Sequence, residues 1–587
     1  MEEFKLPILY SKNACELDDH ILTSLELSHQ TNANDGVDAQ QSIYHAVFPK
    51  NLSYDTPLIN DVSRIYTTDV KYLSDTQRLL KYVSHKKNNI IYNEAPSEAV
   101  CAIRDNNMLQ EWEGLEMDVF CDKYSFISWD HAKFVNVNST FLQAISLYNI
   151  ASPVLSLSAP LFLLLMPFIV INMRGMHITV AEYMSVLTSI ASNYAIVKLF
   201  NTYSTASATE MLWMVASVGL FIFSVYQNIL SCVKFRNNIR LIRGQLCTME
   251  AYLSDSIARM REHLEDISTY STYATFSRDL LVHINVLESL YREISDISIE
   301  KTDTSLARVD IFRIGITMAT FYKIYNDSAT RRSLKYSYHF NCYISIISEM
   351  ASHVREHRVG RAVFSKHSRG PVFSNMFYPK FIVPEAGTSV VKNTVNLNKY
   401  RNIVISGPNA SGKTTMLKST FINILLAQQF GYGCFEKLSF RPFDNLYCYI
   451  NIPDTSGRDS LFQAEARRCK NILDSIESSP RSRHFCIFDE LYSGTNPEEA
   501  SASALAFIKY ISQFDAVHSM ISTHYMNMCS KLDNVSCTQN FNMETIEASH
   551  GALTYKYKLK KGISTVKGGA RILSALNYPA KILSELD

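Results

Sequence analysis

A glycine-rich segment behind a short apolar run is the feature that most constrains the fold of this chain. Residues 402–417 read NIVISGPNASGKTTML, which predicts a buried strand, a tight loop and the start of a helix. The loop fits the pattern G-x-x-x-x-G-K-[ST], in which glycines let backbone N–H groups approach a polyphosphate at a helix N-terminus. In that pattern Lys413 can reach the β and γ phosphates and Thr414 can ligate Mg²⁺. A chance glycine loop is the alternative, and the flanking strand and helix argue against it.

The composition limits the number of domains and the kinds of partner that the chain can have. Its 587 residues are enough for about three or four domains. The chain has 57 Lys and Arg residues and 56 Asp and Glu residues, so a chain-wide basic surface for nucleic acid is absent. This balance does not exclude a local basic patch. The 12 cysteines form no C-x-x-C pair, which argues against a metal cluster or a disulfide framework and favours reduced thiols. No basic stretch followed by an apolar core opens the chain, so no secretory signal is predicted.

Two long runs of uncharged, mainly apolar residues distinguish the next part of the chain from the residues before it. The first lies within residues 134–173 and the second covers residues 211–233. We expect candidate transmembrane helices at about 150–172 and 211–233, because roughly 20 apolar residues span a bilayer. Pro153, Pro160 and Pro167 would kink the first helix, which membrane helices tolerate. Two buried core helices of a soluble protein are the alternative.

Basic residues directly after the second run suggest an orientation. By the positive-inside rule this end is cytoplasmic, so two spans place both termini in the cytosol and residues 174–210 on the far side. That connection is itself apolar, which fits a re-entrant or interfacial segment. The localisation expected is therefore the membrane, or the cytoplasm or nucleus if the chain is soluble. The basic residues are Lys234, Arg236, Arg240 and Arg243.

Two heptad-like seams follow the second run. Apolar residues recur in steps of three and four from Ile239 to Ile267, with one stutter, and again from Phe276 to Ile294. The polar segment 268–275 joins the seams, which predicts an antiparallel helical arm; two helices of a bundle are the alternative. Residues 306–357 are again helical in pattern, and residues 72–80 predict a short amphipathic helix near the start of the chain.

The pattern predicts four regions and an α/β carboxy-terminal domain. Gly370-Pro371 and Tyr378-Pro379 mark a boundary, after which residues 381–383 and 388–392 are expected to form strands. The four regions are a mixed region at 1–133, the apolar region at 134–235, a helical region at 236–370 and the P-loop domain at 371–587. The fold class expected is thus an α/β P-loop ATPase domain preceded by a mainly α-helical part.

Downstream of the loop, two further strands end in residues suited to ATP hydrolysis. The apolar strand from His484 ends in Asp489 and Glu490. The first acid is placed to organise Mg²⁺ and the second to orient or deprotonate the attacking water. The next strand ends in His524, which can hydrogen-bond the γ-phosphate or that water; a purely structural histidine is the alternative.

A hydroxyl-rich turn lies between the loop and the acid strand. Residues 454–468 read DTSGRDSLFQAEARR, in which the turn opens a helix. Its N–H and O–H groups suit an anion, whereas an ordinary capped helix is the alternative. Position alone does not decide between the two.

In this order, five motifs resemble the ATPase domain of the MutS family of DNA mismatch-repair proteins. The resemblance covers residues 378–587, and DELYSGTN, in place of D-E-x-G-R-G-T, looks more like a divergent, membrane-associated branch of that family. Transporter ATPases of the related ABC class carry an L-S-G-G-Q signature that is missing here. The five motifs are GPNASGKTT, DTSGRDSLFQAE, FDELYSGTN, STH and GISTVKGGARILSALNYPAKIL.

The resemblance implies an ABC-class, MutS-type ATPase that uses ATP and Mg²⁺ and forms a homodimer with composite sites. Lys413, Glu490 and His524 would be catalytic, and Thr414 and Asp489 would hold the metal. Ser456, Gly457 and Ser460 match the segment inserted into the partner subunit's ATP site, with one extra residue between the glycine and the second serine. Residues 236–370 correspond loosely to a lever and clamp. The implied nucleotide-binding residues are Ile382, Gly407, Pro408, Asn409, Ala410, Ser411, Gly412, Lys413, Thr414 and Thr415.

The implied function is a dimer that couples ATP binding and hydrolysis to binding of mismatched or irregular DNA, in repair or recombination. Mismatch sensors of this family stack a Phe-x-Glu wedge on the mispaired base. Here the only such triplet is Phe488–Glu490, inside the acid strand. The alternative is therefore a membrane-anchored mechanochemical ATPase that acts on a protein or membrane partner. An ABC-type transporter half is disfavoured, because two spans are too few for a pathway unless the chain multimerises.

Overall fold

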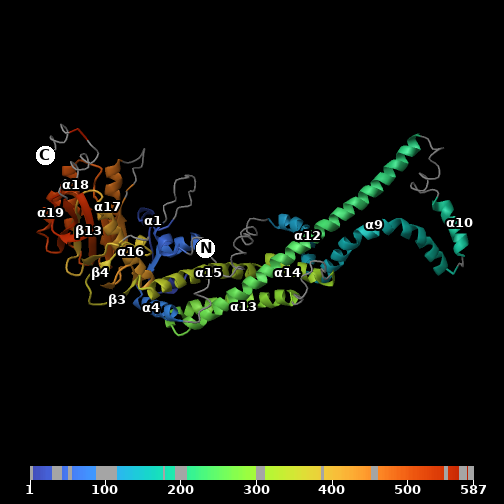
Figure 1. Ribbon diagram of the computed structural model, residues 1–587, viewed down its shortest axis with the longest axis horizontal. Coiled ribbons are helices and arrows are strands. Elements are labelled where there is room, and N and C mark those ends of the chain that lie inside the picture. The colour runs from blue at the N-terminus through green and yellow to red at the C-terminus, as the bar shows by residue number, and fades with distance from the viewer. Residues whose placement is uncertain are drawn as a thin grey trace. The chain divides into compact units, whose positions relative to one another are not determined.

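The fold is that of a computed structural model of the chain (Figure 1). The chain divides into two compact units. The first comprises Met1–Ala95, Arg259–His283 and Tyr336–Asp587, and the second comprises Pro96–Ala258 and Ile284–Lys335. The structure describes residues 4–28, 42–49, 56–86, 116–175, 179–191, 208–298, 311–384, 389–450, 452, 460–547, 553–566 and 578–579.

A six-stranded sheet forms the centre of the first unit. Its strand order is β13-β12-β6-β11-β10-β9, with the five strands from β12 to β9 parallel and β13 antiparallel to β12. All residues of β6 and β11 are buried, as expected of parallel strands covered on both faces. The strands are β6 (Asn402–Ser406), β9 (Asn445–Tyr449), β10 (His484–Asp489), β11 (Val517–Thr523), β12 (Thr538–Glu547) and β13 (Leu553–Lys561).

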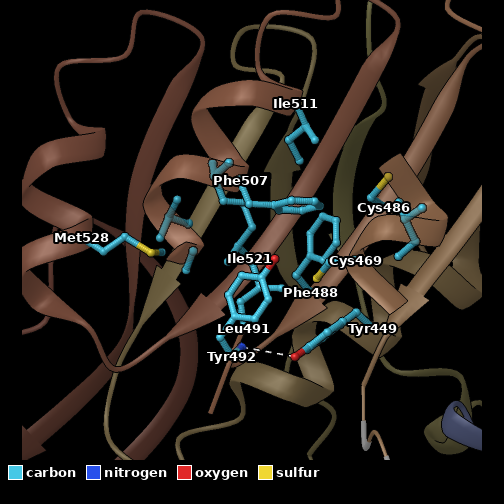
Figure 2. Packing of buried hydrophobic residues seen from close by; sticks show 14 of the residues in the cluster. Tyr449, Cys469, Cys486, Phe488, Leu491, Tyr492, Phe507, Ile511, Ile521 and Met528 are labelled. Atoms are coloured by element: carbon cyan, nitrogen blue, oxygen red, sulfur yellow. Dashed lines mark hydrogen bonds between the residues drawn. The ribbon is translucent and has the colours of Figure 1, made fainter. Parts of the chain in front are cut away.

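Helices cover both faces of this sheet. Cys486 and Phe488 of β10 belong to a core that helices α17, α18 and α19 complete, and Figure 2 shows Phe488 against Phe507 of α18, whose ring centroids are 5.4 Å apart. Because side chains alternate along a strand, Phe485 points to the opposite face, where it meets Phe421 of α16. The helices are α16 (Lys413–Phe430), α17 (Leu461–Ser478), α18 (Pro497–Ile511) and α19 (Met526–Leu532).

A smaller sheet combines strands from before and after the glycine-rich loop, and the segment before the loop corrects one expectation. Residues 381–383 do not form a strand: Pro379 opens the 3-10 helix η6 (Pro379–Phe381), and the amides of Phe381 and Ile382 bond back to Tyr378 and Pro379. These amides are therefore not free for a sheet ladder. Ser389–Lys392 precede the strand rather than form it, and Thr388 lies outside the described residues. The sheet has the order β5-β4-β8-β3-β7, with β3 (Gly360–Phe364), β4 (Val372–Met376), β5 (Asn393–Asn396), β7 (Tyr432–Gly433) and β8 (Lys437–Phe440).

Amino-terminal elements pack on the carboxy-terminal half of α16. Gln429 donates from Nε2 to the carbonyls of Val62 and Ile65, and Gln428 donates to that of Thr67. Residues 1–95 thus share a compact unit with the sheet. The elements are η1 (Pro7–Tyr10), β1 (Ala14–Glu16), α1 (Asp19–Ser24), α2 (Ile43–Val47), α3 (Thr56–Arg64), β2 (Ile65–Thr67) and α4 (Val70–His85), of which α4 contains the helix predicted at 72–80.

Three helix segments complete the first unit. His263, at the end of α12 (Ala208–Ile267), contacts the rings of Phe276 in α13 (Ala274–Ser298) and of Phe340 and Tyr343 in α15 (Ser328–Arg355). The 3-10 helix η4 (Ser271–Tyr273) joins the first two helices. Apart from Leu264 and Tyr291, which are partly exposed, the residues of both predicted seams are buried.

The second unit is helical among its described residues. Phe120 stacks on Tyr325 with ring centroids 3.7 Å apart, and Gly315 approaches α9 so closely that a Cβ atom there would lie 2.2 Å from the Ser139 carbonyl oxygen. These contacts fix α14 against its neighbours. The elements are α8 (Met117–Tyr124), η3 (Asp130–Val137), α9 (Ser139–Met173), α10 (Val180–Ala191), η5 (Ile311–Arg313) and α14 (Ile314–Asn326), with the adjoining parts of α12, α13 and α15.

The two apolar runs lie in α9 and α12. Helix α9 is continuous through Pro153, Pro160 and Pro167, and Figure 1 shows it curved. Among the described residues, two helices are long and apolar enough to cross a membrane by length and composition, at Ser139–Ser158 and within Met211–Ile267. No described side chain of α12 before Phe235 is buried, whereas Phe235, Ile239 and Ile242 are. One helix therefore joins an exposed apolar segment to a buried seam.

Candidate functional site

The glycine-rich loop connects β6 to α16 at the carboxyl edge of the large sheet. Its backbone is left-handed at Ala410 (φ 60°) and Gly412 (φ 93°). A Cβ atom at Gly412 would lie 3.0 Å from the ring of Tyr557 in β13, so a glycine is required there for both reasons. Asn409, Ala410 and Thr415 are exposed, while Pro408 and Ser411 are buried. The exposed part of the loop is thus open to a ligand.

The Lys413 ammonium group lies folded over this loop. Its Nζ donates to the carbonyl oxygens of Gly407 (3.1 Å) and Pro408 (3.2 Å), and the side chain is 5% exposed. Burial lowers the pKa of Lys413, although Glu490 and Asp489 act in the opposite direction. A phosphate group in the loop can take the place of these carbonyl acceptors and supply a charged partner.

Thr414 and Asp489 form an oxygen-rich pair beside the loop. The Thr414 hydroxyl donates to Asp489 Oδ2 at 2.8 Å, and the Ser522 hydroxyl donates to the other carboxylate oxygen. Hydroxyl and carboxylate oxygens fit Mg²⁺, which is commonly held by one or two carboxylates together with substrate phosphates and water. Among the described residues there is no cluster of three or more His, Cys, Asp or Glu side chains that could hold a metal by itself.

Glu490 and His524 meet where β10 and β11 end. His524 Nε2 lies 2.6 Å from Glu490 Oε1, and Lys413 Nζ lies 3.4 Å from His524 Nε2 and 3.9 Å from Glu490 Oε1. The hydrogen bond with His524 lowers the pKa of Glu490, with further lowering from the charges of His524 and Lys413. Glu490 is therefore ionised at neutral pH and can accept a hydrogen bond from a water molecule.

The adjacency of parallel strands explains why these residues meet. Strands β6, β11 and β10 are neighbours in the sheet, and their carboxyl ends lie at one edge. Ser522 also belongs to this group, since its backbone oxygen accepts from the Glu490 amide at 3.1 Å. Sequence reasoning missed Ser522, although the strand that was expected to end in His524 places Ser522 two residues earlier and so on the same face.

Ile382, which the resemblance places among the nucleotide-binding residues, is not the residue that its segment exposes. Ile382 is 2% exposed, whereas the neighbouring Phe381 is 48% exposed. Tyr557, whose ring contacts the loop at Gly412, is 45% exposed. Tyr557 was not predicted as a site residue, because only the folded β12–β13 hairpin brings it to the loop.

The predicted partner-site residues are placed only in part. Ser460 is the N-cap of α17, where its hydroxyl accepts from the Gln463 amide (3.3 Å) and its own amide donates to Gln463 Oε1 (3.0 Å). This is the capped helix start that the sequence offered as the ordinary alternative. Ser456 and Gly457 lie outside the described residues.

Comparison with known proteins identifies the domain that contains this site. Residues 403–586 match the family model of MutS domain V. A DNA mismatch repair protein MutS of Streptococcus sanguinis is 27% identical over 202 residues, and one of Geobacillus sp. is 27% identical over 199 residues. An endonuclease MutS2 of Staphylococcus carnosus is 27% identical over 214 residues.

These similarities cover a limited part of each protein. The matched segments make up 34%, 33% and 36% of this chain and 23%, 22% and 26% of the respective relatives. The match begins inside β6, so it includes the loop, both acids and the strand that ends in His524. The last third of the chain is thus similar to domain V of the MutS family.

Proposed function

We propose that this chain is a Mg²⁺-dependent ATPase that binds ATP at the loop before α16 and hydrolyses it with Glu490 and His524. One observation carries the proposal. Three elements bring Lys413, Glu490 and His524 within 3.9 Å of one another, directly beside an exposed, glycine-containing loop. A cation for the phosphates, an ionised carboxylate for the water and an imidazole on that carboxylate are the groups that phosphoryl transfer to water needs.

The chain's own residues have distinct roles in this proposal. Lys413 exchanges its two carbonyl acceptors for the β and γ phosphates, and the loop amides bind phosphate oxygens. Thr414 and Asp489 would hold Mg²⁺, which when bound neutralises phosphate charge. Glu490 accepts a proton or a hydrogen bond from the attacking water, and His524 fixes the orientation of the Glu490 carboxylate through their 2.6 Å contact.

The direct test replaces the carboxylate by an amide of the same shape. Glu490→Gln should retain ATP binding and reduce turnover by at least about 10²-fold, because the general base is lost. ATP binding is measured with a fluorescent nucleotide and turnover by phosphate release. Unchanged turnover in this variant would remove Glu490 from the reaction.

A homodimer that acts on DNA is the second part of the proposal. Its support is the match of residues 403–586 to MutS domain V, together with relatives that are named as DNA mismatch repair proteins. In such a dimer the segment at Ser456, Gly457 and Ser460 would complete the ATP site of the other copy. DNA binding measured across a range of salt concentrations, with and without ATP, tests the DNA part. Binding that does not depend on nucleotide at any salt concentration would contradict it.

A membrane-anchored ATPase is a second candidate function, favoured by the exposed apolar segment of α12. Exposed basic residues follow this segment, at Lys234, Arg236 and Arg240. A bilayer covers such a surface, whereas in water contiguous apolar patches of this extent are rare on monomers. The exposed large apolar residues of the segment are Met211, Leu212, Trp213, Val215, Leu220, Ile222, Phe223, Tyr226, Ile229, Leu230 and Val233.

Membrane partition separates the two candidates. The tagged chain is expressed, membranes are separated and washed with carbonate, and protease access to residues 174–210 is mapped. Retention after the wash, with both ends accessible only from the cytosolic side, supports the anchored ATPase. Full release from the membranes would leave the soluble, DNA-acting dimer.

A further inference from the structure

A buried carboxylate outside the nucleotide site holds the loop that follows the catalytic acid. Glu465 lies in the second turn of α17, and the residue is 3% exposed. Its Oε1 accepts from the Ser493 hydroxyl at 2.9 Å, and its Oε2 accepts from the Gly494 amide at 3.1 Å. Both oxygens of one carboxylate are thus used by two consecutive residues of one loop.

The loop that Glu465 holds has an unfavourable backbone. It begins at Glu490, whose φ is 51°, and contains Tyr492, whose φ is 60°. Residues with a Cβ atom adopt this left-handed region at an energetic cost, so the conformation persists only where surrounding contacts fix it. The contacts with Glu465 are among those that fix it.

Further contacts attach the same loop to the start of α17. A Cβ atom at Gly494 would lie 2.8 Å from Leu461 Cγ and 2.9 Å from the Phe462 amide nitrogen, so the loop backbone lies directly on the first turn of the helix. The rings of Phe462 and Tyr492 are 5.8 Å apart. The loop therefore has to follow any displacement of this first turn.

Tyr449 of β9 joins the carboxylate and the loop from the sheet. Its hydroxyl accepts from the Tyr492 amide at 3.2 Å, as Figure 2 shows. The pKa of Tyr449 is raised, chiefly by burial and in smaller part by a hydrogen bond with Glu465. Glu465, Tyr449 and the loop thus form one hydrogen-bonded network that ends two residues from Glu490.

We propose that Glu465 is a positioning residue that transmits engagement of the α17 N-terminus by a second copy of the chain to the catalytic Glu490. This inference rests on the proposed ATPase function and its composite sites. Ser460, the described end of the candidate partner-site segment, is the N-cap of α17, and five residues later the helix carries Glu465. A second copy that shifts the start of α17 would shift the loop and with it the Glu490 backbone.

The test compares Glu465→Ala with Glu465→Gln. The alanine variant should lower kcat for ATP about 10-fold or more while the KM for ATP stays within about threefold, because only the geometry of the catalytic step changes. Glutamine should restore much of kcat, since its oxygen still accepts from the Gly494 amide and its NH₂ group can donate to Ser493. Glu477→Ala, an exposed position in the last turn of the same helix, is the matched control.

The dependence of kcat on dimer formation distinguishes transmission from the second copy from a purely structural role of Glu465. In the wild type, kcat per chain should rise with protein concentration as dimers form, whereas in Glu465→Ala it should stay low even where light scattering shows the dimer. If kcat of Glu465→Ala rises as in the wild type, the inference is overturned. If Glu465→Ala does not fold, Ser493→Ala takes its place, because it removes one of the two hydrogen-bond donors of the loop. The same dependence of kcat on protein concentration is then expected of Ser493→Ala as of Glu465→Ala.

Failure of the inference can be told from failure of the proposed function. A wild type without Mg²⁺-dependent ATP hydrolysis at any concentration would end the proposed function and this inference with it. A wild type that hydrolyses ATP, with normal kcat in both Glu465 variants, would end the inference alone.

Discussion

The hydrogen bond between His524 and Glu490 lowers the pKa of the candidate catalytic carboxylate. Both side chains are partly exposed, at 35% and 40%, so water can reach them while the hydrogen bond keeps their orientation. Lys413 lies next to both groups. A phosphate bound at Lys413 would thus stand beside the water that Glu490 orients.

The pH dependence of turnover tests this hydrogen bond. In the proposed reaction Glu490 acts as a carboxylate, so activity should be present above its pKa and should be lost as the pH falls through that pKa. Because His524 lowers the pKa of Glu490, His524→Asn should move the acidic limb of the pH–rate profile to higher pH, besides lowering kcat by about 10- to 10²-fold. An acidic limb that stays in place, or moves to lower pH, would contradict the assigned role of the hydrogen bond.

The burial of His263 leads to a separate prediction about how stability depends on pH. Burial lowers the pKa of His263 to about 3, so the unfolded chain binds a proton at its ordinary pKa while the folded chain does not. Stability is therefore lost as the pH falls below about 6.5, by up to about 2 kcal/mol between pH 6.5 and pH 5.

Replacement of the ring nitrogens should remove that dependence. His263→Phe keeps an aromatic ring among Phe276, Phe340 and Tyr343 and should lose less unfolding free energy between pH 6.5 and pH 5 than the wild type. Urea unfolding at both pH values measures the difference, and His367→Phe, at an exposed position, serves as the control. Equal pH dependence in His263→Phe and the wild type would show that His263 does not contribute.

At the scale of elements, α12 combines two patterns that the sequence presents separately. The apolar run and the heptad seam could each be predicted, because each has its own periodicity or composition. Their continuity follows from the lack of any proline between Ala208 and Ile267. In α9 three prolines lie within one helix, and the sequence predicted the bend but not where it lies.

Charges in the apolar segment of α12 test whether it lies in a bilayer. Leu220→Arg combined with Phe223→Arg should abolish retention in carbonate-washed membranes, since each arginine near the centre of a span costs about 2.5–3.5 kcal/mol. Leu241→Arg changes an exposed leucine of the same helix beyond the apolar segment and should leave retention unchanged. Equal partition of the double variant and the wild type would argue against a spanning helix.

Local sequence patterns predicted the site residues that end or follow strands, but they did not predict the residues that surround the site. Lys413, Asp489 and Glu490 follow or end apolar strands, a relation that is visible along the chain. The strand expected at residues 381–383 failed because Pro379 directs the following amides into a 3-10 turn. Glu465 and Tyr557 could not be found from the sequence, because their roles depend on which loop the folded chain brings to them.

At the scale of the whole molecule, a composite site predicts complementation between inactive variants. Lys413→Ala should not bind ATP in its own loop, and the double variant Ser456→Ala, Ser460→Ala should not complete the site of its partner. Mixing the two should restore activity, because one site in each mixed dimer then has an intact loop and an intact partner segment. Phosphate release by each variant alone and by the mixture measures this, and a mixture no more active than its parts would contradict shared sites.

Mg²⁺-dependent ATP hydrolysis by the wild type and by Glu490→Gln, measured side by side with ATP binding, separates the catalytic role of Glu490 from nucleotide binding. Both proteins should bind ATP, and only the wild type should turn it over at an appreciable rate, with a difference of at least about 10²-fold. ATP hydrolysis at equal rates in the two proteins, or a wild type that does not bind ATP, would contradict the proposed function.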